Sequence, residues 1–423
     1  MEFNGKERIT CRISGEPLVP LFDLGNLYMS DFIPQDSSPR IPQVPLKMCL
    51  APESGLVQLA HTAPSDDMYS TYWYRSGTNA TMTKELQDIA LSGQQTMKTQ
   101  AGDIWVDIGC NDGTLLSALD PSLTRIGIDP AKNGYKEFSE KHANVIVNDY
   151  FSKDSYEKSG FGTKKAKVIT SIAMFYDLED PHSFVKDIES VLDDNGLWIL
   201  QMSYLPLMLK QLAFDNICHE HLEYYTLQSL EYLLKDHGLE VVDCQLNDVN
   251  GGSFRVYIRK TKADKTTFAT APHRDVAAMR TESIRANEEK LDLKNPEVYT
   301  KFYQDIVALK EETVAFIKSE KEKGKKIWGY GASTKGNTLL QWFGLNETLI
   351  DGIAERQPAK FGLKTAGSNI PITSEEDMRA AKPDYLLVLP WHFIAEFRKR
   401  ETSFLQEGGA FIVPCPAFEV IRD

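Results

Sequence analysis

The stretch V106-D-I-G-C-N-D-G-T-L-L116 decides the fold of this chain. The apolar run Ile104-Trp-Val106 leads into it and predicts a buried parallel strand that ends at Asp107. Gly109 and Gly113 follow, and residues without a side chain let the backbone approach a ligand closely. Apolar residues then recur at helical spacing, so the free N–H groups of a helix N-terminus face the same place. We therefore predict a strand, a ligand-binding loop and a helix.

The acids of this loop indicate which ligand it holds. A dinucleotide-binding turn uses G-x-G-x-x-G to hold a pyrophosphate. This chain has G-C-N-D-G instead, with Asp107 and Asp112 on either side, where they would repel phosphates. Acids beside glycines suit a cationic ligand that is rich in hydroxyl groups, namely S-adenosylmethionine (SAM). We predict that Asp107, Gly109, Asn111, Asp112 and Gly113 bind SAM.

Two further strand ends agree with this prediction. The apolar stretch Arg125–Asp129 ends in an acid that is placed to hold the hydroxyls of a ribose. Asn144–Asp149 predicts a third strand with polar groups at its carboxyl end, and we add Asp149 to the SAM site. Three such strand ends in order predict an α/β fold with a class I SAM-dependent methyltransferase core, which is Rossmann-like. The competing interpretation is a generic α/β fold without a SAM site.

Composition excludes several kinds of protein. The net charge of −13 opposes binding to nucleic acid, because a polyanion would be repelled. No apolar run of the sequence approaches the roughly 18 residues of a membrane span, and its first residues are too polar for a signal peptide. The six cysteines form no C-x-x-C pair, which indicates reduced thiols in a cytoplasmic protein. We expect no membrane partner, and a monomer or homodimer.

With 423 residues the chain is too long for one core, and changes in pattern divide it into four parts. Residues 1–83 are rich in Pro, Gly and short strand-like pieces, which predicts a small, irregular N-terminal lobe. Residues 84–262 alternate strand and helix patterns and form the SAM-binding domain. Residues 263–322 are charged and helical and form a packed spacer. Residues 323–423 form a second Rossmann-like domain.

This second domain opens with a glycine loop of a different character. The strand Lys326–Ala332 runs into glycines, and S-T-K-G-N-T-L-L opens a helix. Lys335 lies inside the loop, where a cation and backbone N–H groups suit a phosphate. We predict that Gly331, Lys335 and Asn337 bind a substrate phosphate, although a merely solvated lysine is the alternative. The distance along the chain from Gly331 to Gly336 weakens a third interpretation, a dehydrogenase or epimerase that binds a dinucleotide here.

The segment Phe214–Tyr225 gathers histidines, carboxylates and tyrosines between the fifth strand and an amphipathic helix. We expect it to lie over the carboxyl edge of the sheet, where ligands bind. If the segment is extended, His219 and His221 face one way and Glu220 the other. A metal site is one interpretation, but no third ligand is evident nearby, and buried or helix-capping histidines are another. Acid–base chemistry is favoured because histidine exchanges protons near neutral pH.

Together these motifs resemble the sugar-nucleotide C-methyltransferases: the mycarose-type 3-C-methyltransferases of deoxysugar biosynthesis and their relatives in surface-polysaccharide clusters. The resemblance runs nearly from end to end and is carried by P45-L-K-M-C-L-A-P-E-S-G-L-V-Q-L59, the SAM loop, C218-H-E-H221, N250-G-G-S-F-R-V-Y257, W328-G-Y-G-A-S-T-K-G-N-T-L-L340 and P383-D-Y-L-L-V-L-P-W391. It implies an N-terminal lobe, a SAM domain and a C-terminal domain that helps to hold a nucleotide sugar. It also implies a keto-deoxysugar that is deprotonated beside its carbonyl and methylated at that carbon.

The N-terminal lobe departs from this family. Its members hold zinc there with two C-x-x-C pairs. Here the first pair reads Cys11-Arg-Ile-Ser14, and the second falls on Ala51 and Ser54, with Cys49 out of register. One remaining ligand cannot hold zinc, so we expect no zinc and no other metal. Two more departures, Cys218 where tyrosine is common and Tyr176 where a histidine often follows the fourth strand, leave the sugar and the methylated carbon open.

The chemistry assigns roles to the candidate residues. Methylation at carbon needs a base, stabilisation of an enolate and an aligned methyl sulfonium. We predict that His221 is the base, that Glu220 orients the sugar or a partner histidine, and that His219 and Tyr176 donate to the enolate oxygen.

The remaining predicted contacts are to the sugar substrate, from Tyr74, Cys218, Tyr224 and Asn250. Tyr74 either closes the site from the N-terminal lobe or packs between lobes. The nearest alternative function is an O- or N-methyltransferase that uses the same base on a sugar or small metabolite. A degenerate SAM- or nucleotide-binding protein is the alternative of another class, and the intact SAM loop and H-E-H weaken it.

Overall fold

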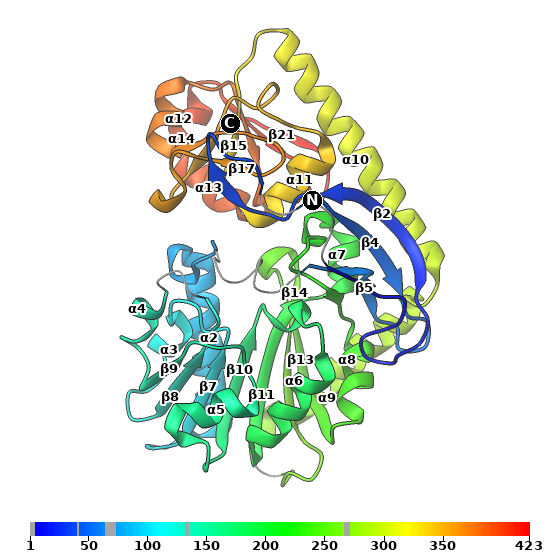
Figure 1. Ribbon diagram of the computed structural model, residues 1–423, viewed down its shortest axis with the longest axis vertical. Helices are drawn as coiled ribbons and strands as arrows, with labels where there is room; N and C mark the ends of the chain where they lie inside the picture. The colour runs from blue at the N-terminus through cyan, green and yellow to red at the C-terminus, as the bar shows by residue number, and fades with distance from the viewer. Residues whose placement is uncertain (1–4, 40–41, 64–72, 132–134, 266–270) are drawn as a thin grey trace.

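A seven-stranded sheet carries the predicted SAM loop and fills the lower half of Figure 1. The computed structural model describes residues 5–39, 42–63, 73–131, 135–265 and 271–423. β7, β8, β9, β10 and β11 run parallel, whereas β14 and β13 are antiparallel to their neighbours. Across the sheet the strands are β13 (Leu239–Asn247), β14 (Ser253–Lys260), β11 (Leu192–Ser203), β10 (Ala166–Ile172), β7 (Ile104–Ile108), β8 (Thr124–Ile128) and β9 (Val145–Val147).

The order of the strands places the glycine loop at a switch point. The chain moves from β7 outward to β8 and β9, and then returns to β10 on the opposite side of β7. In open α/β sheets, ligands bind outside the carboxyl ends of the strands at such a point. Since β7 ends at Ile108, directly before the loop, the loop lies at that position. The predicted class I Rossmann-like core is confirmed.

Helices cover both faces of this sheet, because a parallel sheet buries both of its faces. On one face, α2 (Ala80–Met97) and α3 (Thr114–Ser117) share a core with Trp105 of β7. On the other face, α6 (Pro181–Val191) and α8 (Leu227–Lys235) share a core with Ile104 and Val106. Successive β7 side chains therefore enter opposite cores, as strand geometry requires. The short helices beside the sheet are α4 (Lys136–Ser139), α5 (Lys153–Tyr156) and α7 (Leu205–Lys210).

The N-terminal lobe is more regular than the sequence predicts. Its strands β2 (Val19–Leu27), β4 (Val44–Leu50) and β5 (Val57–Leu59) form an antiparallel sheet. The fourth strand of that sheet is β12 (Glu223–Tyr224), which comes from the end of the H-E-H segment. This pairing fixes the segment between the lobe and the SAM domain. Two small strand pairs complete the lobe: β1 (Lys6–Glu7) with β6 (His61–Thr62), and β3 (Phe32–Pro34) with β17 (Leu363–Thr365).

Two turns of the lobe bring together the positions that were compared with zinc ligands. Cys11 Sγ lies 3.5 Å from Ser54 Oγ, and the Glu16 carboxylate accepts hydrogen bonds from Ser14 Oγ at 2.8 Å and from Ser54 N at 2.9 Å. Ala51 contributes no ligand atom. One thiol and a carboxylate engaged in hydrogen bonds do not fit a tetrahedral zinc site. Over the described ranges, no three His, Cys, Asp or Glu side chains cluster in a way that could hold a metal ion.

The C-terminal domain repeats the strand, loop and helix on a smaller sheet (Figure 1). Only β21 runs antiparallel to its neighbour in this sheet. The strand order is β18 (Ile372–Ser374), β16 (Ile353–Glu355), β15 (Ile327–Tyr330), β19 (Tyr385–Val388), β20 (Ala410–Val413) and β21 (Glu419–Ile421). The helices are α11 (Thr334–Phe343), which follows the glycine loop, α12 (Glu375–Ala381), α13 (Ile394–Arg400) and α14 (Thr402–Gln406).

The two helices of the predicted spacer belong to different parts of the molecule. α9 (Ala271–Leu291) packs on β13 of the large sheet. α10 (Pro296–Glu322) runs beside β2 of the N-terminal lobe and up to the C-terminal domain (Figure 1). Its buried face, which includes Phe302, Ile306 and Leu309, joins the same core as the C-terminal strands. Of the helices placed in the structure, none combines the length and apolar character needed to cross a membrane.

Candidate active site

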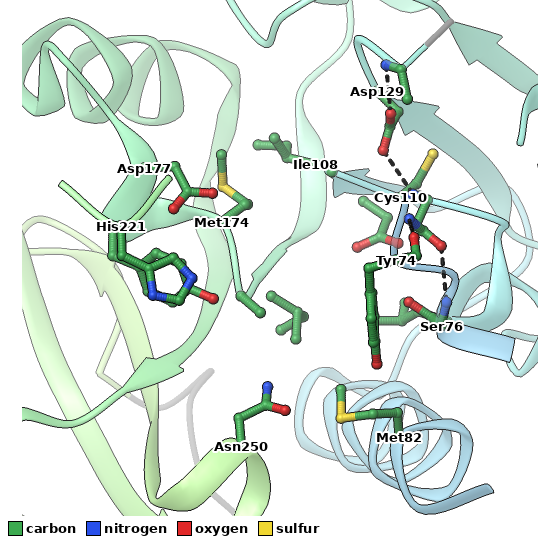
Figure 2. Close-up of a pocket in the computed structure, with 18 of the residues that line it drawn as sticks. Tyr74, Ser76, Met82, Ile108, Cys110, Asp129, Met174, Asp177, His221 and Asn250 are labelled. Carbon is green, nitrogen blue, oxygen red and sulfur yellow. Dashed lines mark hydrogen bonds between the residues drawn. The ribbon is translucent and has the colours of Figure 1, made fainter. Parts of the chain in front are cut away.

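A cavity of about 370 Å³ lies at the carboxyl ends of β7, β8 and β10 (Figure 2). The SAM domain forms most of its wall, the N-terminal lobe closes one side, and the loop before α11 enters from the C-terminal domain. In Figure 2, His221 and Asp177 lie on one side of the cavity and Tyr74 and Asp129 on the other. Half of the residues predicted from sequence line it: Asp107, Gly109, Asn111, Asp129, Tyr74, Tyr176, His221, Asn250 and Lys335.

Asp129 holds the glycine loop against the end of β8. Its Oδ2 accepts a hydrogen bond from Asn111 N at 2.8 Å, and its Oδ1 accepts one from Ala131 N at 2.9 Å. Burial raises the pKa of Asp129, and the two amides oppose that rise. Gly109 has φ 71°, which favours glycine, and a Cβ there would lie 3.2 Å from Met174 Cγ. A partly buried acid beside a glycine loop fits the ribose hydroxyls of SAM.

Asp107 ends β7 and is almost fully buried, with 4% of its surface exposed. It accepts a hydrogen bond of 2.7 Å from the Thr170 hydroxyl. Burial raises the pKa of Asp107 to about 7, although the bond from Thr170 lowers it. A cationic ligand in the cavity would favour the ionised carboxylate. This electrostatic environment fits a sulfonium ion such as SAM and does not fit a phosphate.

An arm of the N-terminal lobe closes the cavity over the SAM loop. Ser76 N donates to Asn111 Oδ1 at 3.0 Å, and Asn111 Nδ2 donates to Tyr74 O at 2.9 Å. Arg75 Nε forms an ion pair with Asp112 Oδ2 at 3.0 Å. Asp112 therefore faces the arm and does not line the cavity, which corrects its predicted contact with SAM.

His221 is held in one orientation and one tautomer. Its Nδ1 lies 2.8 Å from the Asn216 carbonyl oxygen, which can only accept a hydrogen bond, so the ring proton is on Nδ1 and Nε2 is left to take a proton. Tyr176 packs against the ring, with centroids 4.3 Å apart. Burial, and then the charge of nearby Lys335, lowers the pKa of His221 to about 3. The imidazole is therefore neutral at pH 7.

Lys335 reaches this site from the start of α11. Its Nζ donates to Asn216 Oδ1 at 2.5 Å and to Asn250 O at 3.3 Å. Burial lowers the pKa of Lys335, and the nearby Asp215 carboxylate opposes this. The side chain is thus directed into the SAM-domain cavity and away from the glycine loop that carries it.

The glycine loop of the C-terminal domain does not have the form predicted for a phosphate site. The Ala332 N–H donates to Glu355 Oε2 at 3.0 Å, and the Gly336 N–H donates to Ser333 Oγ at 3.0 Å. A carboxylate of the protein therefore occupies the place predicted for an anion. Gly331 does not line the cavity, and Asn337 Nδ2 donates to Asp31 O at 3.1 Å.

The two histidines of H-E-H point to different places, because the segment turns where the sequence analysis considered it extended. His221 N donates to Cys218 O at 3.1 Å, which closes the turn. His219 is buried, and its Nε2 lies 3.0 Å from Val44 O of the N-terminal lobe. It does not line the cavity, so its predicted donation to an enolate is corrected. Glu220 and Cys218 also lie outside the cavity lining.

Three more predicted residues have other positions. Asp149 is partly exposed, does not line the cavity and forms an ion pair of 2.7 Å with Lys158. Gly113 directly precedes α3, and a Cβ there would lie 2.8 Å from Ser139 Cα, so this position requires close packing. Tyr224 borders a small second cavity beside His221, and its hydroxyl donates to Asn216 O at 3.3 Å.

The sequence analysis missed Asp177 and His392, which both line the cavity. Asp177 Oδ1 is shielded from solvent and has no hydrogen-bond partner among the described residues. Burial, then the charges of Glu220 and Glu223, raises the pKa of Asp177 well above its usual range. The signal for Asp177 was the run F-Y-D-L-E-D after the fourth strand, in which Tyr176 was chosen and the acid that follows it was not.

Comparison with known protein families agrees with the methyltransferase fold. Residues 74–243 match the family described as a methyltransferase domain, and residues 248–416 match the family described as the C-methyltransferase C-terminal domain. The C-methyltransferase NovU of Streptomyces niveus is 29% identical over 378 residues, which are 89% of this chain and 87% of that protein.

Solved structures also match the chain in part. Magnesium protoporphyrin IX methyltransferase from Synechocystis PCC 6803, with bound SAH, is 13% identical and covers 43% of this chain and 88% of its own, with a TM-score of 0.34. An S-adenosylmethionine-dependent methyltransferase from Clostridium acetobutylicum is 12% identical and covers 42% of this chain and 92% of its own, with a TM-score of 0.33.

The fold, the site and the two matching families define the class of this protein. It is a SAM-dependent methyltransferase with a class I core and a second, C-terminal domain. Its cofactor is SAM. Over most of its length it is similar to a C-methyltransferase.

Proposed function

We propose that this enzyme methylates a carbon atom of a nucleotide-linked keto-deoxysugar, with His221 as the base. The observation that carries the proposal is the neutral imidazole, held through Nδ1 by the Asn216 carbonyl, in the wall of the cavity that contains Asp107 and Asp129. The resemblance of the sequence motifs to sugar-nucleotide C-methyltransferases supports the substrate class. The similarity to NovU supports methylation at carbon.

A sugar carbon becomes a nucleophile only when a neighbouring carbonyl acidifies its proton. His221 Nε2 takes that proton, and the Asn216 carbonyl stabilises the resulting imidazolium through Nδ1–H. Tyr176 restricts rotation of the ring by packing on it. When bound, SAM supplies an electrophilic methyl group. The arm that carries Tyr74 and Ser76 covers one side of the cavity, because both residues are hydrogen-bonded to Asn111.

The sugar is proposed to lie between the SAM part of the cavity and the C-terminal domain. Ser333, Thr334 and His392 line the cavity on that side, so the nucleotide would extend toward this domain. Asn250, on the SAM domain, also lines the cavity, and its carbonyl oxygen accepts from Lys335 Nζ of the C-terminal domain at 3.3 Å. Asp177, with its unbonded oxygen, can accept from or donate to a sugar hydroxyl, depending on its protonation.

The test is a screen of nucleotide-linked 4-keto-6-deoxysugars with the purified enzyme. Two readouts are needed: addition of a methyl group in the presence of SAM, and exchange of the proton beside the carbonyl with deuterium oxide in its absence. We expect both, and His221→Asn should lose both. Methyl addition without exchange would indicate an O- or N-methyltransferase and would overturn the proposal. SAM binding without any methyl transfer across the panel would also count against it.

A further inference from the structure

We propose that Lys335 is a catalytic residue, whose ammonium group stabilises the enolate oxygen that forms when His221 removes the proton. This inference rests on the proposed function and extends it, because it gives the C-terminal domain a part in the chemistry as well as in substrate binding. Lys335 lines the same cavity as His221 although it lies in the first turn of α11 in the other domain.

One residue positions both groups. The Asn216 carbonyl oxygen accepts from His221 Nδ1 at 2.8 Å, and its side-chain Oδ1 accepts from Lys335 Nζ at 2.5 Å. The Asn250 carbonyl oxygen is a second acceptor for Nζ, at 3.3 Å. His221 and Lys335 are therefore held at a fixed separation, because both are hydrogen-bonded to Asn216. Such a fixed pair costs no reorganisation at the moment of reaction.

The ammonium group has neutral partners. Both of its acceptors are uncharged oxygens, and no carboxylate of the described residues forms an ion pair with Nζ. Asp215 lies close enough to raise the pKa of Lys335, but its Oδ2 accepts from Trp391 Nε1 at 3.1 Å. A partly buried cation whose direct hydrogen-bond partners are neutral is poised to meet a negative charge that appears beside it. The other titratable groups that face it are His221, His392, Cys218 and Asp215.

The charges that form during the reaction explain why Lys335 lies beside His221. Without substrate, the positive charge of Lys335 disfavours protonation of His221. In the reaction the C–H bond breaks, an N–H bond forms at Nε2, and the electron pair of the C–H bond moves through the new C=C bond onto the carbonyl oxygen. A negative oxygen then lies between two cations, imidazolium and ammonium. Lys335 keeps its protons and stabilises the enolate more than the ketone, which is the requirement for catalysis.

The arrangement also explains why Lys335 is not placed as a phosphate ligand. A phosphate on this loop would need the loop amides, but the N–H groups of Ala332 and Gly336 donate to Glu355 and Ser333. The lysine turns away from them and toward Asn216. A cation separated from the amides of its own loop does not form an anion-binding nest.

The experiment compares Lys335→Met with Lys335→Arg and with Lys326→Met, which changes an exposed lysine directly before β15. Methionine keeps the length and removes the charge. We expect the exchange rate at saturating nucleotide sugar to fall roughly 10²–10³-fold, as for loss of one group that stabilises an oxyanion. KM for the nucleotide sugar and the dissociation constant for SAM should change little. Lys335→Arg should retain part of the rate, and Lys326→Met all of it.

A second readout needs no substrate and tests the geometry directly. NMR titration of labelled histidine, assigned with His221→Asn, should show a higher pKa for His221 in Lys335→Met, because a nearby positive charge has been removed. An unchanged His221 pKa overturns the inference, and so does a raised KM with an unchanged saturated exchange rate. If the wild-type enzyme exchanges no proton of any nucleotide keto-sugar, the proposed function fails, and the histidine titration still decides whether the cation acts on the base.

Discussion

The two glycine loops of the molecule share one pattern, but one lies beside an open cavity and the other is filled by side chains of its own domain. In both, a strand runs into glycines, a helix follows, and an acid at the end of the next strand accepts from a loop amide. Asp129 accepts from Asn111 N at 2.8 Å, and Glu355 accepts from Ala332 N at 3.0 Å. Asp129 also lines a cavity, whereas Glu355 faces Lys360 Nζ at 3.5 Å.

The two loops differ in whether a side chain of the protein occupies the space beside the acid. Lys360 Nζ also donates to Ala332 O at 2.7 Å, so the C-terminal loop supplies its own cation for its own acid. The SAM loop has no such residue among those that the structure describes, and the cavity remains for a ligand. A glycine loop followed by an acid is therefore not enough to make a ligand site. The space beside the acid must also be free of the protein's own side chains. Lys335 follows the filled loop in the chain, but its side chain lines the open cavity.

The largest expected effect tests whether the chemistry belongs to the cavity of the SAM loop. His221→Asn removes the base and should lower the rate of methyl transfer about 10²–10⁴-fold, with unchanged SAM affinity. His219→Asn is the matched control, because His219 hydrogen-bonds to Val44 outside the cavity. Its activity should be largely retained and its thermal stability reduced. Loss of activity in His219→Asn with an active His221→Asn would reverse the assignment.

The second prediction compares the two acids directly. Asp129→Ala should weaken SAM binding by about 3 kcal/mol, or roughly 10²-fold, because hydroxyls and a loop amide lose a charged partner. Glu355→Ala should leave SAM affinity unchanged, since Glu355 is occupied by its own domain. Isothermal titration calorimetry of both variants provides the measurement. Equal losses in the two variants would show that the loops do not differ as described.

The sequence predicts the SAM loop well because its information is local. The strand, the two glycines and the acid at the end of the next strand lie within a short stretch, and sheet topology alone brings them together. Asp107, Gly109, Asn111 and Asp129 accordingly line the cavity. Their contacts with SAM stay predictions, and the fold class is confirmed.

The rest of the site depends on contacts between distant segments. The direction of His219 depends on Val44 of the N-terminal lobe, and that of Lys335 on Asn216 of the SAM domain. Periodicity within the segment cannot show either partner. The same holds for β12, whose pairing with β5 turns the H-E-H segment away from an extended course. Sequence reasoning therefore found the chemical groups and misplaced several of their side chains.

The third prediction concerns the filled loop and its stability. Glu355→Gln leaves Lys360 without its carboxylate and should lower the free energy of unfolding by about 2 kcal/mol. The double variant Glu355→Gln/Lys360→Met should lose less than the sum of the single losses, because the uncompensated charge is gone. Urea denaturation of the four proteins measures this coupling. Simple additivity would show that the pair does not stabilise the loop.

The smallest effect on stability is expected for Glu179, which lines the open cavity and is bound by residues of the N-terminal lobe. Glu179 accepts from Arg8 Nε at 2.9 Å and from Thr62 Oγ1 at 2.7 Å, and it pairs with Arg12 at 3.3 Å. Burial favours protonation of this acid, but these bonds and charges outweigh it and lower the pKa of Glu179 from 4.5 to about 2. A depressed pKa in the folded state stabilises the fold at pH values above the unfolded pKa.

That contribution should be lost as the pH falls from 4.5 to about 2. Urea midpoints across this interval should therefore fall more steeply for the wild type than for Glu179→Gln, which does not titrate. Above pH 5 the two curves should run parallel, with the wild type more stable. Parallel curves throughout the acid interval would mean that the lobe does not depend on this carboxylate. A steeper fall in the wild type would show that Glu179 stays ionised because of its contacts with the N-terminal lobe, such as the ion pair with Arg12. Glu355 differs, because its partner Lys360 belongs to its own domain.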